Sequence, residues 1–371
     1  MSKTGGTPNN PGQDDVEQVI GNYERQLAMA REIKDRREEG NALYNLGSAY
    51  GNSGRIEKTI GYFEQQLAVA REIRERGAEG VALGDLGLSY VLLGQVEKAI
   101  AYHEQQLVIV TEIKDRRMEG DALGKLGSAY YLLGQVEKAI GYGEQALAIA
   151  REIKERRAEG VTLGDLGRAY AALGQVEKAI EYHEQQLVIV AEIEDRRMEG
   201  NALGNLGLAY ADLQQFEKAI GYYEQQLAIT REIMDRHGEA VALGNLGSAY
   251  ARLGQVKKAI SFYEKDLVIV REIKDRRGEQ AALGNLAIAY KNLGRLEQAT
   301  GYLEQTLEIA REIKDRRGEG IGHFNLGQAL EQQGKIEAAI REVEQARAIF
   351  MEVKAPYVAQ CDAALARLRG E

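Results

Sequence analysis

A repeat of forty residues fills most of this chain and constrains its fold more than any other feature. The segment from Met118 to Arg157 recurs without a gap from about residue 38 to residue 357. A strict period of this length is typical of a solenoid, in which each unit packs mainly against its neighbours, and not of one globular core. The sequence therefore predicts one elongated array, whose eight units start near residues 38, 78, 118, 158, 198, 238, 278 and 318.

Apolar residues return at helical spacing within each unit. In the third unit Leu126 and Tyr130 belong to one stripe, and a second stripe runs from Val136 to Ile149. Two stripes of this kind predict two amphipathic helices, separated at Gly134 and at its equivalents in other units. The sequence therefore predicts an all-α solenoid of tandem antiparallel helix pairs.

Glycine and acidic residues mark the helix ends. A glycine between the two helices can take a positive φ and end the first one, but Gln214 stands there in the fifth unit. A left-handed backbone at Gln214 should cost about 1 kcal/mol relative to glycine. Acids before each first helix, such as Asp115 and Glu155, are expected to be its N-cap or a first-turn acid. A second glycine, such as Gly127, is expected to let the two helices approach closely.

The ends of the array differ from its middle. Residues 1–13 are rich in Gly, Pro and Asn and are predicted to be a disordered leader without a site. Residues 14–37 match the second half of a unit, which predicts a single N-terminal helix. Residues 358–371 predict a short amphipathic helix that caps the last apolar face. The opening half repeat has no such cover, so we expect a second copy of the chain, or a further part of a longer protein, to cover it.

Composition excludes several classes of partner. The formal net charge of −9 over 371 residues leaves no basic footprint for nucleic acid or for an anionic membrane. The recurring Arg pairs, such as the one at Arg116, are expected to be neutralised by acids three residues on, such as Glu119. Cys361 is the only cysteine, which excludes an internal disulfide. With no signal sequence and no apolar run of roughly 20 residues, the sequence predicts a cytoplasmic protein without nucleic-acid or membrane partners.

No constellation of residues carries chemistry. His103 and His183 lie two units apart, too far to share a metal ion, and Phe63, Tyr223 and Tyr263 occupy the same position in other units. These histidines are therefore expected to be packing residues. The sequence contains no Gly-rich phosphate loop, activated nucleophile or metal cluster. We expect a protein that is not an enzyme and that has no cofactor and no metal.

The unit resembles the tetratricopeptide repeat family over almost the whole chain. Leu126, Gly127 and Tyr130 of the first helix and Ala139 of the second match the signature of the family and recur in most units. The unit is six residues longer than the usual 34 and is similar to the repeats of Pins-type adaptors, kinesin light chains and bacterial signalling proteins. The resemblance implies a right-handed superhelix with a concave groove that binds a protein or peptide partner.

The resemblance also places the candidate site. In the family, the groove is lined by the face of the first helix that the core stripe leaves free, which here means positions 41, 44, 45, 48, 51 and 52 and their equivalents. We call this surface the first-helix face. The family uses the Asn of an LGNLG segment to hold a peptide backbone or a carboxylate, and this carries over to Asn45 and its equivalents but fails at Asp85, Lys125 and Asp165. The candidate groove residues are Asn45, Asp85, Leu88, Lys125, Tyr131, Asp165, Arg168, Asn201, Asn205, Asn245, Arg252, Asn285 and Asn325.

These residues predict a non-catalytic protein-interaction scaffold that binds an extended or helical peptide segment in the groove. An amide can both donate to and accept from a peptide main chain, so the Asn residues would grip a peptide independently of its sequence. Three alternatives remain open. The first is that the Asn residues serve only as contacts between units. The second is that the chain is the ligand-sensing segment of a larger signalling protein, and the third is that it is a homo-oligomer assembled through the solenoid ends.

Overall fold

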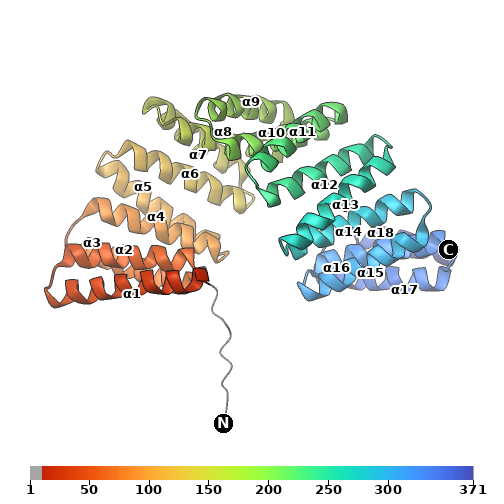
Figure 1. Cartoon of the computed structure of the whole chain (residues 1–371), viewed down its shortest axis with the longest axis horizontal. Helices are drawn as coiled ribbons and strands as arrows, with labels where there is room; N and C mark the ends of the chain where they lie inside the picture. The colour runs from red at the N-terminus through yellow and green to blue at the C-terminus, as the bar shows by residue number, and fades with distance from the viewer. Residues whose placement is uncertain (1–10, 371) are drawn as a thin grey trace, which may run out of the picture. The chain divides into compact units, whose positions relative to one another are not determined.

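The computed structural model describes residues 11–370, and side chains from residue 16 onward. This part of the chain consists of eighteen helices joined by short turns, without a strand (Figure 1). It divides into two compact units, residues 1–189 and 190–371. The predicted all-α class is confirmed.

Eight helix pairs follow the first helix, α1 (Pro11–Glu32), and precede the last, α18 (Val358–Arg369). The first helices of pairs 1 to 8 are α2 (Arg36–Asn52), α4 (Arg76–Leu92), α6 (Arg116–Leu132), α8 (Arg156–Ala172), α10 (Arg196–Asp212), α12 (Arg236–Arg252), α14 (Arg276–Asn292) and α16 (Arg316–Gln332). The second helices are α3 (Ile56–Glu72), α5 (Val96–Glu112), α7 (Val136–Glu152), α9 (Val176–Glu192), α11 (Phe216–Glu232), α13 (Val256–Glu272), α15 (Leu296–Glu312) and α17 (Ile336–Glu352).

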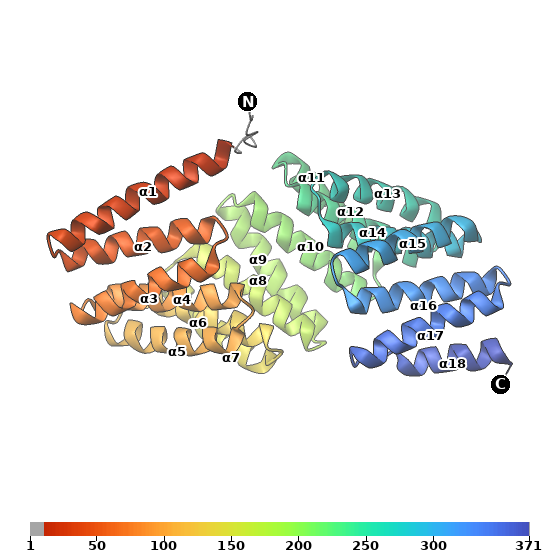
Figure 2. The same cartoon turned by 90° about the horizontal axis from the view of Figure 1, so that it is seen from below.

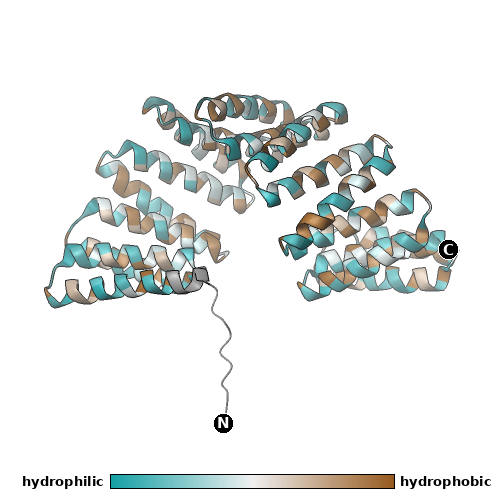
Figure 3. Cartoon of the chain, in the orientation of Figure 1, coloured by the Kyte–Doolittle hydropathy of each residue, from teal (hydrophilic) through white to brown (hydrophobic). Residues whose placement is uncertain are grey.

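Packing within each unit follows the order of the chain. In residues 1–189 each of the helices α1 to α7 packs against the next one, and in residues 190–371 each of the helices α10 to α17 does so (Figures 1 and 2). First helices of neighbouring pairs also touch, as α4 with α6 and α14 with α16 do. Apolar residues are interspersed with polar ones along the helices (Figure 3). Those that recur at helical spacing on one face, such as Leu83 and Leu86 of α4, are buried. This nearest-neighbour packing is that of an α-solenoid.

At the ends of the array, α1 begins at Pro11, inside the segment predicted to be a leader. The rest of that prediction, residues 1–10, lies outside the described residues. At the other end α18 packs against α17, where Cys361 and Leu365 join Val343 and Phe350 in one buried cluster.

In most pairs the two helices meet where a side chain of the second helix lies against a glycine of the first. A Cβ atom on Gly87 would stand 2.3 Å from the His103 imidazole, and one on Gly207 would stand 2.4 Å from the Tyr223 ring. The close approach predicted for these glycines is confirmed, and so is the packing role of His103, which is fully buried. We call the second-helix position the ring slot; it holds Phe63, His103, Gly143, His183, Tyr223, Tyr263, Leu303 and Val343.

Left-handed residues end both helices of a pair. The glycines that follow the first helices, Gly54 to Gly334, have φ between +71° and +75°, and Gln214 has φ +59°, as predicted. The second helices end in the same way at non-glycine residues such as Lys114 (φ +57°), which the sequence did not reveal. Asp115 caps α6 by accepting the N–H of Met118. Of the two roles expected for Glu155, the N-cap is wrong, because its side chain makes no capping hydrogen bond.

A network of arginine and glutamate joins successive pairs. In α4 the buried Glu79 accepts hydrogen bonds from Arg71 of α3 (2.8 Å) and from Arg76 (2.6 Å), and Arg76 also pairs with Glu112 of α5. Burial alone would raise the pKa of Glu79, but the hydrogen bonds from the two arginines lower it below its usual value. Pairs three residues apart, such as Arg116 with Glu119, confirm the predicted neutralisation of the Arg residues at 116 and its equivalents.

Replacing Gln214 by glycine should stabilise the protein. A residue without Cβ removes the steric cost of the left-handed backbone, so the variant Gln214→Gly should gain about 1 kcal/mol, seen as a higher urea midpoint. Gly254→Gln, at the equivalent position of the next pair, should lose a similar amount. Equal midpoints for both variants and the wild type would contradict this account.

Glu79→Gln should lower the urea midpoint by the equivalent of about 1–3 kcal/mol, because it removes the buried charge that two arginines share. Glu112→Gln is the matched control, since it removes a charge paired with the same Arg76. The Glu79 side chain is 7% exposed and that of Glu112 is 59% exposed. An exposed pair contributes at most about 1 kcal/mol, so the control should change the midpoint less. The reverse order would contradict a stabilising role for the network.

Candidate functional site

The predicted Asn residues of residues 190–371 lie on consecutive first helices. Asn205, Asn245, Asn285 and Asn325 come from α10, α12, α14 and α16, and each is half-buried. Within the described part of the chain, no hydrogen bond from another residue engages their side-chain amides. This counts against the alternative that they serve only as contacts between units.

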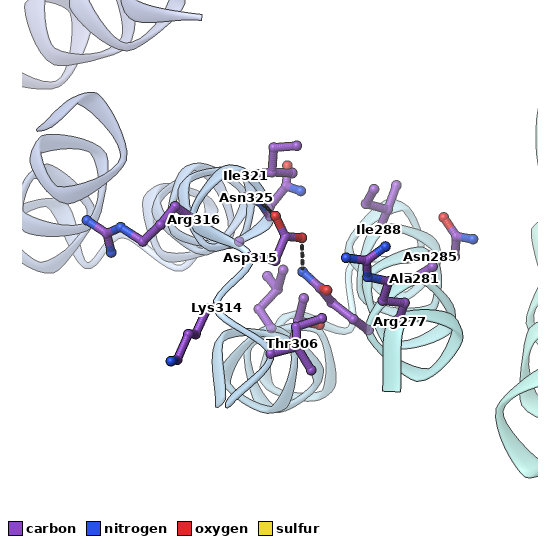
Figure 4. Close-up of a pocket in the computed structure, with 16 residues that line it drawn as sticks. Arg277, Ala281, Asn285, Ile288, Thr306, Lys314, Asp315, Arg316, Ile321 and Asn325 are labelled. Atoms are coloured by element: carbon purple, nitrogen blue, oxygen red, sulfur yellow. Dashed lines mark hydrogen bonds between the residues drawn. The ribbon is translucent and has the colours of Figure 1, made fainter. Parts of the chain in front are cut away.

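A hollow of about 690 Å³ lies between α14 and α16 (Figure 4). Asn285 and Ile288 line it from α14, and Asn325 and Ile321 line it from α16. Leu303 and Thr306 of α15 line it as well. At its edge the Gln280 side chain donates to the Asp315 carboxylate (3.1 Å). Two predicted Asn residues thus share one recess with apolar neighbours.

A second hollow, of about 790 Å³, lies along α4, α6 and α8 in residues 1–189. It brings together the predicted Leu88, Lys125 and Asp165 with apolar side chains, among them Met118 and Leu132. Lys125 is paired with Asp121 (2.6 Å). Here the positions equivalent to the Asn residues carry charge, so this recess offers apolar contact with mixed charge rather than amides.

Asp85 of α4 is the equivalent of Lys125 and Asp165, and the environment of its carboxyl group is unusual. One of its oxygens, Oδ2, is buried without a hydrogen-bond partner. Burial raises the pKa of Asp85 to about 6, against an opposing effect from Lys125 and with a further increase from Asp121. A carboxyl group with this pKa changes its protonation just below neutral pH.

Asp165, Arg168 and Tyr131 form one cluster. The Asp165 carboxylate accepts a hydrogen bond from Arg168 and another from the Ser128 hydroxyl (3.2 Å). The Arg168 guanidinium lies 5.9 Å from the centre of the Tyr131 ring. All three predicted residues therefore meet between α6 and α8.

The remaining predicted residues lie on first helices but outside these two hollows. Asn45 is half-buried on α2, Asn201 is exposed on α10, and the exposed Arg252 lies over the Phe216 ring (5.5 Å). The sequence reasoning missed Thr306, which lines the hollow from a second helix. The signal that could have found it is its position, which is occupied by Gln66 and its equivalents in other pairs.

No group of three or more His, Cys, Asp or Glu side chains in residues 16–370 is placed to hold a metal ion. None of the described helices is long and apolar enough to span a membrane.

Asp85→Asn should stabilise the protein at pH 7.5 by up to about 2 kcal/mol and leave it nearly unchanged at pH 4. An ordinary Asp has a pKa near 3.9, so the folded wild type holds a proton between about pH 4 and 6 that the unfolded chain releases. Wild-type stability therefore falls as the pH rises through this window, and the variant lacks this loss. Thermal midpoints from pH 4 to pH 8 measure the difference.

Asp165→Asn is the control, because it occupies the same register but removes an acceptor that Arg168 and Ser128 use. Its midpoint should be unchanged or lower throughout the range. A lower midpoint for Asp85→Asn at pH 7.5 would contradict the buried, unpaired state of the Asp85 carboxyl.

Comparison with known proteins identifies the fold and the family. Among solved structures, the chain is similar to a signal transduction ATPase with a tetratricopeptide repeat sensor from Pyrococcus horikoshii (TM-score 0.67, 19% identity). The matched region covers 95% of this chain and 54% of the ATPase. It is also similar to the apo form of the quorum sensor NprR from B. thuringiensis (TM-score 0.65, 14% identity, 91% of this chain and 99% of that one). A third is aspartyl phosphate phosphatase F from Bacillus subtilis (TM-score 0.61, 13% identity, 94% and 96%).

At these identities the likeness shows the fold alone, and no curated protein matches the sequence. The family model for the tetratricopeptide repeat matches residues 38–112, 118–187, 198–266 and 279–352. Because these matches cover well over half of the chain, the protein belongs to the tetratricopeptide repeat family.

Proposed function

We propose that this protein is a non-catalytic protein-interaction scaffold whose first-helix face binds an extended peptide segment of a partner. Membership of the tetratricopeptide repeat family supports protein binding in general. The observation that carries the finer proposal is the row of half-buried, unengaged amides of Asn205, Asn245, Asn285 and Asn325 on four consecutive first helices.

The spacing of these helices suits an extended chain. Packed helices lie about 8–10 Å apart, and an extended peptide rises about 3.3 Å per residue. One Asn therefore comes within reach about every third residue of the peptide. Each amide can donate to a peptide carbonyl and accept from a peptide N–H, so four of them would hold a segment of about ten residues by its main chain.

Apolar recesses beside the amides would select side chains. Ile288 and Ile321 line the hollow that also contains Asn285 and Asn325. A peptide held by its backbone at the two Asn residues would place a neighbouring side chain over these isoleucines. Backbone contacts would then supply affinity, and the recess would favour apolar residues at one peptide position.

A sensor segment of a larger signalling protein is the second candidate. The chain is similar to an ATPase described as having a tetratricopeptide repeat sensor, of which it spans 54%, and to a protein named as a quorum sensor. Such a segment would also bind its ligand on the first-helix face.

The triple variant Asn205→Ala, Asn245→Ala and Asn285→Ala should lose peptide binding. Twelve-residue peptides selected from a displayed library on the wild type provide the ligands. Three lost hydrogen bonds of about 0.5–1.5 kcal/mol each should weaken binding by ten-fold or more. Isothermal titration measures the dissociation constants, and circular dichroism checks that the variant is folded.

The matched control replaces three exposed amides on second helices, Gln225, Gln298 and Gln345, by alanine. Its affinity should equal that of the wild type. A peptide with N-methylated main-chain amides should bind the wild type weakly if its backbone is what the Asn residues hold. Equal affinity of the Asn variant and the wild type would move the site off the Asn row.

A further inference from the structure

Pair 3 lacks the side chain that every other pair places in its ring slot. The slot holds a ring in five pairs, at Phe63, His103, His183, Tyr223 and Tyr263, and an aliphatic side chain at Leu303 and Val343. In pair 3 it holds Gly143. A glycine therefore faces the glycine of the first helix, Gly127.

A second side chain is missing at the same place. Gln106 and Gln186 lie against Gly84 and Gly164 in the pairs on either side of pair 3, where a Cβ would meet them at 2.6 Å and 2.4 Å. The residue equivalent to these glutamines in pair 3 is Ala146, and a Cβ on Gly124 would meet nothing within 4 Å. Two positions of α7 on the same side of the helix, Gly143 and Ala146, thus both carry smaller side chains than their equivalents in the adjacent pairs.

The helices of pair 3 have not moved together to fill the gap. A Cβ on Gly127 would stand 3.2 Å from the carbonyl oxygen of Ala139, and in pair 8, where Val343 fills the slot, a Cβ on Gly327 would stand 3.2 Å from the same atom of Ala339. Leu166 of α8 reaches toward Gly143, where a Cβ would stand 2.8 Å from its Cδ2. A cavity of about 160 Å³ remains.

The cavity is apolar inside and polar at its mouth. Leu132, Ala139, Leu166 and Ala169 line it together with the three glycines. The polar residues Ser128, Tyr131, Thr162, Asp165 and Arg168 complete the lining. Ser128, Thr162 and Asp165 also line the 790 Å³ hollow of the first-helix face, together with Leu132 and Gly124. The cavity therefore opens into the part of the first-helix face that residues 1–189 form.

The volume matches a single six-membered ring, because an apolar protein cavity of about 150 Å³ accommodates benzene. The other pairs show what fits between these helices, since five of them place a ring there. In pair 6 the hydroxyl of Tyr263 reaches Ser248 (3.2 Å), which is the equivalent of Ser128. A ring that enters from the mouth points the other way, so its tip would lie against Gly143 and Ala139.

A hydroxyl at that tip would meet only helical backbone and apolar side chains, and an unpaired buried hydroxyl is unfavourable. We infer that pair 3 forms a binding site for the phenyl ring of a phenylalanine side chain from a bound peptide, with Asp165, Arg168 and Ser128 beside the peptide main chain at the mouth. This inference rests on the proposed function, to which it adds the identity of one anchor residue.

The test uses a ligand that needs no Asn row, N-acetyl-L-phenylalaninamide, with the whole chain. Wild-type protein should show saturable shifts of the methyl resonances of Ala139, Leu132 and Leu166 at millimolar ligand, and N-acetyl-L-alaninamide should not produce them. Gly143→His, which places in pair 3 the residue of pairs 2 and 4, should weaken binding at least ten-fold. Gly141→His is the control, because Gly141 is exposed on the same helix with nothing within 4 Å of its Cβ position.

If the histidine variant does not fold, Gly143→Val replaces it in the test. This variant places in pair 3 the residue type found at Val343 of pair 8, and it should also weaken binding of the phenyl ligand. Wild-type protein without saturable methyl shifts, or filled variants that bind as well as the wild type, would overturn the inference. The Asn triple variant should bind this ligand as the wild type does. Failure of the phenyl site therefore leaves the peptide proposal standing, and loss of peptide binding in the Asn variant says nothing against the phenyl site.

Discussion

In six of the eight helix pairs, the contact on which the pair is built joins a first-helix glycine to the side chain in the ring slot; pair 3 has Gly143 in the slot, and pair 7 has Ala287 in place of the first-helix glycine. There a ring lies against bare backbone, as His103 does at Gly87 and Tyr223 at Gly207, and fills the space between the two helices. Burying a large side chain there contributes about 1.5–3 kcal/mol. The same contact orients the first helix, so that positions such as Asn245 stay half-buried on its free face. The candidate site is therefore built on this packing.

Much of this arrangement was predictable from the sequence. The forty-residue period gave the helix pairs, and the glycine at Gly134 and its equivalents gave the left-handed ends, Gln214 included. The family resemblance then placed the candidate residues on first helices. These features are local or strictly periodic, and repetition in the sequence reports them directly.

Other features depend on contacts between positions that no period links. The sequence pairs the glutamates at this register with the arginine three residues before them, but it does not reveal that Glu79 is buried or that Arg71 of the preceding helix also holds it. The raised pKa of Asp85 arises from burial that its neighbours in space create. The sequence shows that Gly143 differs from its equivalents. That this difference leaves a cavity follows only from the structure, in which the ring slot faces Gly127. The missing information in each case is which side chains meet across helices.

The arginine and glutamate network is not equally complete along the chain. Thr111 and Ala191 stand where the other junctions have an arginine from the preceding second helix. The glutamates beside them, Glu119 and Glu199, are only half-buried, with side chains 17% and 20% exposed against 7% for Glu79. In an array held mainly by contacts between neighbours, a force that pulls on the two ends acts on every junction at once, so the junctions with the fewest contacts yield first. Under such a force the contacts at the junctions that contain Thr111 and Ala191 would break first. Pairs 3 and 4, which lie between these junctions, would separate from the rest of the array as one block.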